Sequence, residues 1–234
     1  MKLQVSNLNA WYGPAHILFD LDLNVGDGEV VALLGRNGAG KSTTFKSLVG
    51  LLERRSGRIV YEGHDLSGRP THEIVRAGLG YVPEDRRIFT ELTVEENLEV
   101  GRQPPRKGAP TWTAEKLYEL FPNLGAMRER PGGRMSGGEQ QMLTIARTLM
   151  GNPGLVLLDE PSEGLAPKIV EDMAAAILAM KREGLSLVIS EQNLHFARLI
   201  SDRAVIIERG RVRFSGTIAE LEAKPEVKEA YLAV

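Results

Sequence analysis

The chain has 234 residues, 42% of them hydrophobic and 26% charged, a mix typical of a globular protein with one large domain or a domain with a sub-lobe. A formal net charge of −2 provides no overall basic field, so we expect no nucleic-acid partner. The absence of cysteine excludes disulfides, thiolate catalysis and cysteine-ligated metals, and no apolar run approaches the ~18–20 residues that span a membrane.

Short strand-like runs fill the first part of the chain. Residues 3–8, 17–23 and 30–34 are rich in apolar side chains and are separated by turns such as the one at 26–28. A further run between glycines at 57–63 predicts another short strand.

The most specific motif lies between the predicted strand at 30–34 and a predicted helix that begins with Thr43. It reads Gly35-Arg36-Asn37-Gly38-Ala39-Gly40-Lys41-Ser42 and fits the spacing G-x-x-x-x-G-K-[ST] of a phosphate-binding loop. In this pattern backbone N–H groups surround phosphate oxygens, Lys41 adds a charge for the outer phosphates, and the Ser42 hydroxyl can ligate Mg²⁺. The dipole of the following helix also favours an anion. We therefore assign all eight residues and Thr43 to a site for a nucleoside triphosphate and Mg²⁺.

The middle of the chain changes character. From about Thr93 to Glu129 the pattern is helical, but glycine and proline break it repeatedly. This predicts a helical sub-lobe with irregular joints.

A helix is predicted to begin at Ser136 and extend to Leu149. Ser136 can cap this helix, and Glu139 at the third position can complete a capping box. The backbone N–H groups exposed at Gly137 and Gly138 can equally form a second anion site. The residues alone leave both interpretations open.

An apolar strand at 155–158 ends in two acids, Asp159 and Glu160. Because the carboxyl ends of parallel strands face the ligand crevice, Asp159 is placed to support Mg²⁺. Glu160 is placed to orient and deprotonate a water molecule that attacks the γ-phosphate. The alternative is an acidic strand end that caps the next turn.

The rest of the chain alternates between helix and strand. A helix over about 168–183 has an apolar stripe typical of core packing, and strands are predicted at 186–190 and 204–207. This alternation predicts an α/β fold with a largely parallel sheet covered on both faces.

Three of these motifs, in this order, resemble the ATP-binding cassette (ABC) ATPases over nearly the whole chain: the loop at 35–42, Ser136-Gly137-Gly138-Glu139, and the strand at 155–160. The resemblance implies a P-loop NTPase fold with a mostly parallel core sheet, an N-terminal antiparallel β portion and an inserted α-helical subdomain. It implies a single ABC ATPase domain over 1–234, with a catalytic core at about 1–85 and 150–234 and a helical subdomain at about 86–149.

The same resemblance implies how two chains cooperate. In that family the motif at 136–139 contacts the γ-phosphate of ATP bound to the opposite subunit, which implies a head-to-tail dimer with two ATP molecules. Tyr12 matches the aromatic residue that stacks on adenine, a contact that adds modest affinity and little base specificity. A turn or core aromatic is the alternative for Tyr12.

Three positions depart from the broad family. Glu84 stands where glutamine is usual, and its carboxylate can join the metal shell or pair with Arg86 or Arg87. Gln192 stands where histidine is usual; its amide can donate to a γ-phosphate oxygen or to the attacking water, but cannot take up a proton near neutral pH. Ala166 replaces an aspartate of many relatives and so lacks one polar contact between subunits.

These departures resemble one subfamily, the ATPases of importers for branched-chain amino acids and the related urea and amide importers. The resemblance rests on runs such as Tyr81-Val82-Pro83-Glu84, Gly164-Leu165-Ala166-Pro167 and Glu191-Gln192-Asn193. It implies integral-membrane permease subunits that dock near residues 84–89 and the helical sub-lobe. It also implies a second ATPase subunit that is identical or different, and a solute-binding protein that acts indirectly.

The expected function is therefore ATP hydrolysis that powers uptake of a small solute, above all branched-chain amino acids. The expected location is peripheral, at the cytoplasmic face of the inner (plasma) membrane. Two other functions stay open: the ATPase of a urea or amide importer, and a regulatory nucleotide-binding subunit that hydrolyses weakly. An ABC-type ATPase that acts on DNA or ribosomes is disfavoured, because the chain has one cassette and no basic tail.

Overall fold

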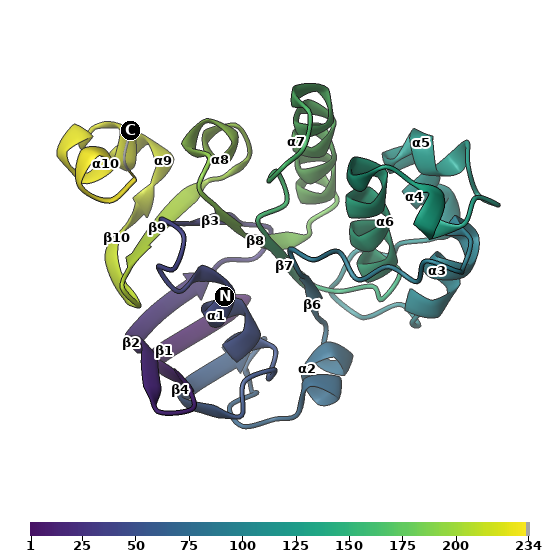
Figure 1. The fold of residues 1–234 in the computed structure, drawn as a ribbon. Helices are drawn as coiled ribbons and strands as arrows, with labels where there is room; N and C mark the ends of the chain where they lie inside the picture. The colour runs from purple at the N-terminus through teal and green to yellow at the C-terminus, as the bar shows by residue number, and fades with distance from the viewer. Residues whose placement is uncertain (233–234) are drawn as a thin grey trace.

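A six-stranded sheet crosses the centre of the molecule (Figure 1). The computed structural model describes residues 1–232 and gives the strand order β10-β9-β3-β8-β7-β6. The strands are β3 (Val30–Leu34), β6 (Leu79–Val82), β7 (Leu155–Asp159), β8 (Ser186–Glu191), β9 (Arg203–Glu208) and β10 (Arg211–Thr217). All neighbours are parallel except β10, which is antiparallel to β9. The predicted α/β class is confirmed.

A second, antiparallel sheet has the order β2-β1-β4-β5. Its strands are β1 (Leu3–Tyr12), β2 (Ala15–Val25), β4 (Arg54–Tyr61) and β5 (His64–Asp65). The first two are longer than the runs at 3–8 and 17–23 suggested, because they form one hairpin that turns at Gly13, where φ is 54°. This sheet is the expected N-terminal antiparallel portion.

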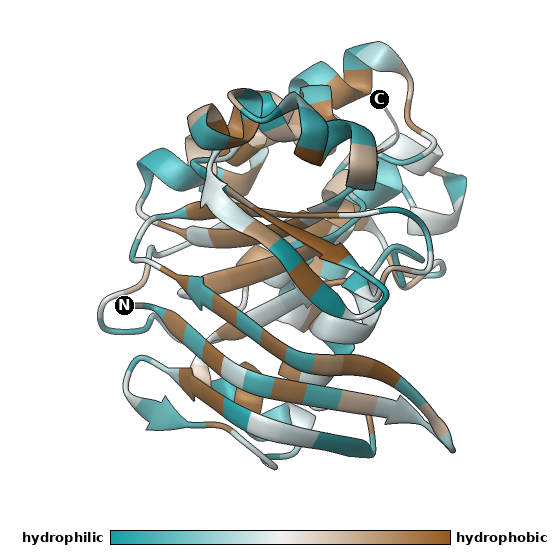
Figure 2. Ribbon diagram, turned by 90° about the vertical axis from the view of Figure 1, so that its left-hand side faces the viewer, coloured by the Kyte–Doolittle hydropathy of each residue, from teal (hydrophilic) through white to brown (hydrophobic). Residues whose placement is uncertain are grey.

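The two sheets share a core around helix α1 (Lys41–Leu48). Phe45 and Leu48 of this helix belong to one buried cluster with Leu8 of β1 and Leu157 of β7. In Figure 2 the antiparallel strands carry alternating hydrophobic and hydrophilic residues, as one-sided burial requires. The strands β3, β7 and β8 are instead buried at every position. The phosphate loop is therefore held between two packed elements, the buried strand β3 before it and the buried helix α1 after it.

Most of the helices lie on one side of the central sheet (Figure 1). The middle of the chain forms α3 (Val94–Gly101), α4 (Ala114–Leu120), α5 (Pro122–Gly125), the 3₁₀ turn η1 (Gly132–Arg134) and α6 (Gly137–Leu149). The remaining helices are α2 (Thr71–Ala77), α7 (Pro167–Arg182), α8 (Leu194–Ile200), α9 (Ile218–Glu222) and α10 (Pro225–Leu232).

The interrupted helical pattern of the middle region is thus confirmed. One apolar cluster runs from Leu98 and Leu117 of this region to Leu158 and Ile177 of the core. Because the cluster is continuous, the subdomain limits near 86 and 149 stay a prediction. Within residues 1–232, no helix combines the length and apolar character needed to cross a bilayer.

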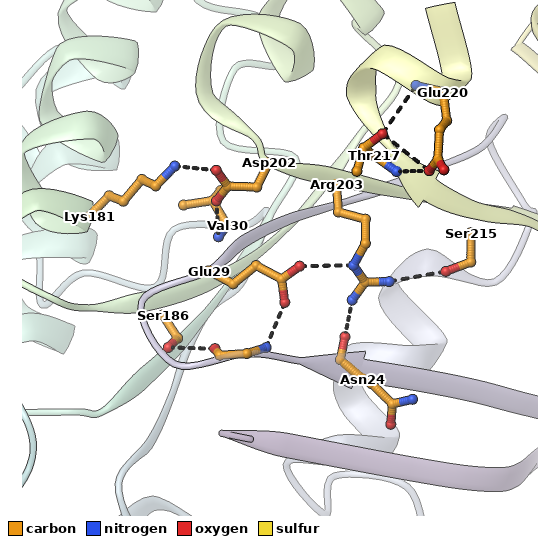
Figure 3. Close-up of polar contacts among 11 residues, drawn as sticks. Asn24, Glu29, Val30, Lys181, Ser186, Asp202, Arg203, Ser215, Thr217 and Glu220 are labelled. Atoms are coloured by element: carbon orange, nitrogen blue, oxygen red, sulfur yellow. Dashed lines mark hydrogen bonds and ion pairs between the residues drawn. The ribbon is translucent and has the colours of Figure 1, made fainter. Parts of the chain in front are cut away.

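A polar network closes the amino ends of the parallel strands (Figure 3). Arg203 of β9 donates from Nε to Glu29 Oε1 at 2.8 Å and from Nη1 to Ser215 Oγ at 3.0 Å. Glu29 also accepts from the N–H of Gly26 at 2.6 Å. Asp202 accepts from the N–H of Val30 at 2.9 Å. The turn before β3 is thereby fastened to β9 and β10, at the end of the sheet opposite the strands' carboxyl ends.

Candidate nucleotide site

The predicted phosphate loop connects β3 to α1. Lys41 is 4% exposed, and its Nζ donates to the carbonyl oxygens of Gly35 at 2.8 Å and Arg36 at 3.2 Å. Gly40 has a φ of 113°, and a Cβ there would lie 2.8 Å from Leu18 Cδ2, so a larger residue would be both strained and crowded. The loop therefore curls around the Lys41 ammonium, and its binding of phosphate stays a prediction.

Asp159, at the end of β7, lies directly beside this loop. Its Oδ1 accepts from Ser42 Oγ at 3.1 Å and from Ser190 Oγ at 2.6 Å, and its Oδ2 accepts from Tyr81 OH at 3.2 Å. Burial raises the pKa of Asp159, and these three hydrogen bonds partly oppose the rise.

The predicted metal-binding pair, Ser42 and Asp159, is thus in contact. A hydroxyl and a carboxylate are hard oxygen donors that suit Mg²⁺. Within residues 1–232, no three acidic or histidine side chains gather into a metal cluster. A Mg²⁺ ion here would therefore complete its coordination with phosphate oxygens and water, as is usual at nucleotide sites.

Glu160 follows Asp159 and is held at both carboxylate oxygens. Its Oε1 lies 3.0 Å from Lys41 Nζ, and its Oε2 accepts from Gln192 Nε2 at 2.8 Å. Its φ of 45° is left-handed, which is strained for a glutamate. The sequence-predicted base is therefore fixed between the phosphate loop and the loop after β8.

The protonation of Glu160 depends on its neighbours. Burial favours the neutral acid, but hydrogen bonds from Glu163, Gln192 and Lys41 outweigh burial and hold the pKa of Glu160 below its ordinary value. The hydrogen bond to Glu160 raises the pKa of Glu163 to about 7. As pH falls to about 7 and below, Glu163 takes up the proton of the pair first, so Glu160 is the ionised member, as a general base must be.

Two other predicted residues, Tyr12 and Glu84, have exposed side chains. Tyr12 is 45% exposed at the end of β1, whereas its neighbour Trp11 stacks on His16 with a centroid separation of 4.4 Å. The core alternative for Tyr12 is wrong; the turn alternative stays open, and stacking on adenine stays a prediction. Glu84 is exposed in the loop after β6. Within residues 1–232 it forms no ion pair with either neighbouring arginine.

The alternative pairing of Glu84 with Arg87 is not realised, because Arg87 pairs with Asp85 at 2.8 Å. Glu84 adds to the negative field that raises the pKa of Glu163. A metal role for Glu84 stays a prediction.

The start of α6 has the predicted capping box. Ser136 N–H donates to Glu139 Oε2 at 2.7 Å, and Glu139 N–H donates to Ser136 Oγ at 3.4 Å. A Cβ on Gly137 would lie 2.6 Å from Arg86 Nη1, and a Cβ on Gly138 would lie 2.9 Å from Ile169 Cγ2. Among residues 1–232, no hydrogen bond or ion pair joins the segment 136–139 to the phosphate loop. The cap is confirmed, and the anion-binding role stays a prediction.

Sequence reasoning missed three polar contributors to the site, Tyr81, Ser190 and Glu163. Tyr81 and Ser190 lie near the carboxyl ends of β6 and β8, which flank β7 in the sheet. A polar residue near the carboxyl end of each predicted strand could have marked Tyr81 and Ser190 as candidate site residues. Only the strand order shows that both of these strands are neighbours of the strand that ends in Asp159.

A second surface feature is a groove between α2, β6 and α3. Its volume is about 1010 Å³. The large apolar side chains of Leu51, Val75, Phe89 and Val100 line it and are 43–54% exposed. Arg147 of α6 lies at its edge, 5.0 Å over the Phe89 ring. Exposed apolar side chains gathered in a groove mark a protein contact surface.

Comparison with known proteins agrees with this geometry. A family model described as ABC transporter matches residues 18–163. The chain is 44% identical over 230 residues to the high-affinity branched-chain amino acid transport ATP-binding protein BraG of Pseudomonas aeruginosa, covering 98% of this chain and 99% of BraG. It is 37% identical over 232 residues to the lipopolysaccharide export system ATP-binding protein LptB of Haemophilus influenzae, covering 98% and 96%. A crystal structure of a nucleotide-free ATP-binding cassette from an ABC transporter superposes with a TM-score of 0.83 at 26% identity, covering 97% of each chain.

Proposed function

The chain belongs to the ABC transporter family, and from that membership we propose that it is the ATPase of an importer for branched-chain amino acids. That it is an ATP-binding, ATP-hydrolysing subunit follows from the family itself. The solute and the direction of transport are the proposed part. The similarity to BraG over almost the full length of both chains supports them.

The observation that carries the catalytic proposal is the placement of Glu160 between Lys41 and Gln192. We assign ATP phosphates to the N–H groups of the loop 35–43 and the charge of Lys41. Ser42 and Asp159 would hold Mg²⁺, with Glu84 near its shell, and the ion would neutralise charge on the phosphates. Tyr12 would stack on adenine.

In this mechanism Glu160 accepts a proton from the water that attacks the γ-phosphate. Lys41 and Gln192 hold its two oxygens, so the carboxylate keeps one orientation. Gln192 has no titratable proton, so it orients Glu160 and the water but does not act as an acid. Glu163 takes up the proton of the pair before Glu160 does, which leaves Glu160 able to accept one from water.

The site is proposed to be half of a composite. A second ATPase subunit, identical or different, would supply its Ser136, Gly137, Gly138 and Glu139 to the γ-phosphate. This predicts that ATP turnover per chain rises with protein concentration, which a turnover series over a wide dilution range measures. Turnover per chain that stays constant over that range would contradict the composite site.

The apolar groove supports the proposed membrane partner. Phe89 and Val100 offer an apolar surface that a cytoplasmic helix of a permease can bury, and the chain would then lie at the cytoplasmic face of the inner membrane. The solute-binding protein would act through the permease alone. Adding a charge with Phe89→Asp is expected to prevent co-purification with membrane subunits while ATP still binds.

A second candidate is export of lipopolysaccharide, which the 37% identity to LptB favours. Urea or amide import and a weakly hydrolysing regulatory role are further alternatives. The deciding experiment introduces Lys41→Ala into the gene for this chain in its own host. Uptake of labelled leucine, urea and acetamide is then measured, together with the amount of lipopolysaccharide at the cell surface. The proposal predicts loss of leucine uptake alone; loss of lipopolysaccharide or of another uptake, with normal leucine uptake, would overturn it.

A further inference from the structure

Glu191, the last residue of β8, is a buried carboxylate that the catalytic proposal does not use. Its side chain is 3% exposed, and among residues 1–232 it forms no ion pair. A buried carboxylate without a cation is costly unless hydrogen bonds satisfy its oxygens. The hydrogen-bond donors to Glu191 therefore show which parts of the chain this side chain holds in place.

Those partners are backbone N–H groups from two different loops. Oε1 accepts from the N–H of Ser162 at 3.2 Å, in the loop that follows Glu160. Oε2 accepts from the N–H groups of Gln192 at 3.3 Å and Asn193 at 3.4 Å, in the loop that follows β8. Burial raises the pKa of Glu191, and the bonds to Ser162, Gln192 and Asn193 oppose the rise. One side chain thus joins the loop of the predicted base to the loop of the residue that orients it.

The adjacent residue of β8 holds the other side of the same loop. The N–H of Glu160 donates to Ser190 Oγ at 2.9 Å and to Ser190 O at 3.2 Å. Ser190 therefore fixes the backbone at Glu160, and Glu191 fixes it two residues later. Glu160 has the strained φ of 45°, a conformation that costs on the order of 1–3 kcal/mol and persists only where neighbouring contacts impose it.

We propose that Glu191 is a positioning residue for ATP hydrolysis: its two oxygens clamp the loops of Glu160 and Gln192 together, and so fix the base in its working orientation. The inference rests on the proposed role of Glu160. Glu191 itself touches neither nucleotide nor water in this account. It acts only through the two loops.

The first test is Glu191→Gln, which keeps the size of the side chain but places an NH₂ group against an N–H donor. One side of the clamp then opens. Because misplacement of a catalytic group by about 1 Å costs up to ~100-fold in rate, we expect kcat to fall about ten- to a hundredfold. The Kd for ATP, measured by calorimetry, is expected to stay within about twofold, since the phosphate loop is held by β3 and α1.

Two companion variants make this test specific. Glu191→Asp keeps the charge but shortens the reach, so it is expected to lower kcat in the same way, and it serves if Glu191→Gln does not fold. Glu29→Gln changes a hydrogen-bonded carboxylate at the opposite end of the sheet (Figure 3). It is expected to lower the melting temperature and leave kcat unchanged.

The decisive test adds Glu191→Gln to Glu160→Gln and measures the residual single-turnover hydrolysis of labelled ATP. If Glu191 acts through Glu160, its replacement has no further effect once that carboxylate is gone. A second full loss in the double variant would overturn the inference. Normal kcat in Glu191→Gln, with slow hydrolysis in Glu160→Gln, would overturn this inference alone, whereas normal hydrolysis in Glu160→Gln would overturn the proposed base.

Discussion

Apart from the Lys41–Glu160 pair beside the phosphate loop, the two ends of the central parallel sheet use charged residues in opposite ways. At the amino ends, Arg203 and Glu29 pair with each other and with nearby backbone groups (Figure 3). At the carboxyl ends, Asp159 and Glu191 have no cationic partner among residues 1–232, and hydroxyl or backbone N–H groups hold them. The first arrangement satisfies every charge locally and stabilises the fold. The second keeps carboxylates buried and oriented, at a cost in stability, beside the phosphate loop.

The difference shows how one sheet separates stability from chemistry. Paired charges at the amino ends hold the turn before β3. The amino end of the strand that leads into the phosphate loop is thereby fixed. At the other end, the loop after β7 combines the left-handed backbone of Glu160 with a lowered pKa of Glu160 and a raised pKa of Glu163. The following predictions test this division, from the largest expected effect to the smallest.

The largest effect is expected for Glu160→Gln. The amide keeps the shape of the side chain but cannot accept a proton, and a general base contributes typically 10²–10⁴-fold. We expect kcat for ATP hydrolysis to fall about 100- to 1000-fold, measured by phosphate release at saturating ATP. A rate within threefold of the unaltered protein would show that another group is the base.

The next effect is expected for Lys41→Ala. The ammonium that Gly35 O and Arg36 O surround would be lost, and a charged hydrogen bond contributes about 1.5–3 kcal/mol. ATP binding, measured by calorimetry, is expected to weaken by roughly 10- to 100-fold. The matched control is Lys46→Ala in the same helix, for which an unchanged Kd is expected. Equal losses in both variants would contradict the assignment of the loop.

At the amino ends, Arg203→Met is expected to lower the free energy of unfolding by about 1–3 kcal/mol, because Glu29 Oε1 and Asn24 O lose their donor. Urea unfolding measures the change. Arg213→Met is the control, since its pair with Glu208 is more exposed and contributes about 0–1 kcal/mol. Equal destabilisation by the two variants would show that the Arg203 network stabilises the fold no more than an exposed ion pair does.

The smallest effect concerns pH. The pKa of Glu163 is raised to about 7 in the folded protein, above its ordinary value of 4.5. The folded state therefore binds the proton more tightly, and this contribution is full below pH 4.5 and lost as pH rises to about 7. Glu163→Gln is expected to flatten the fall in melting temperature between pH 5 and 7.5. An unchanged pH profile in this variant would refute the shared proton.

The sequence was most informative where the signal is local. The phosphate loop, the acids that end β7 and the capping box at Ser136 each depend on residues a few positions apart, and the structure has each of them in the predicted form. The helix at 168–183 and the strand at 30–34 were found in the same way, from periodicity and apolar runs.

What the sequence did not predict depends on register between distant strands. Ser190 meets Asp159 only because β7 and β8 are neighbours and pair with these two residues in line. Arg203 and Glu29 are 174 residues apart, so no local pattern links them. The strand β10 was missed because its side chains alternate between exposed and half-buried, which leaves no continuous apolar run.

The central claim is that chemistry and stability lie at opposite ends of the sheet. The most direct test measures kcat and the melting temperature on the same preparations of Glu160→Gln and Glu29→Gln. We predict that Glu160→Gln loses turnover, and that Glu29→Gln keeps turnover and melts at a lower temperature. Parallel losses of both quantities in both variants would contradict the claim.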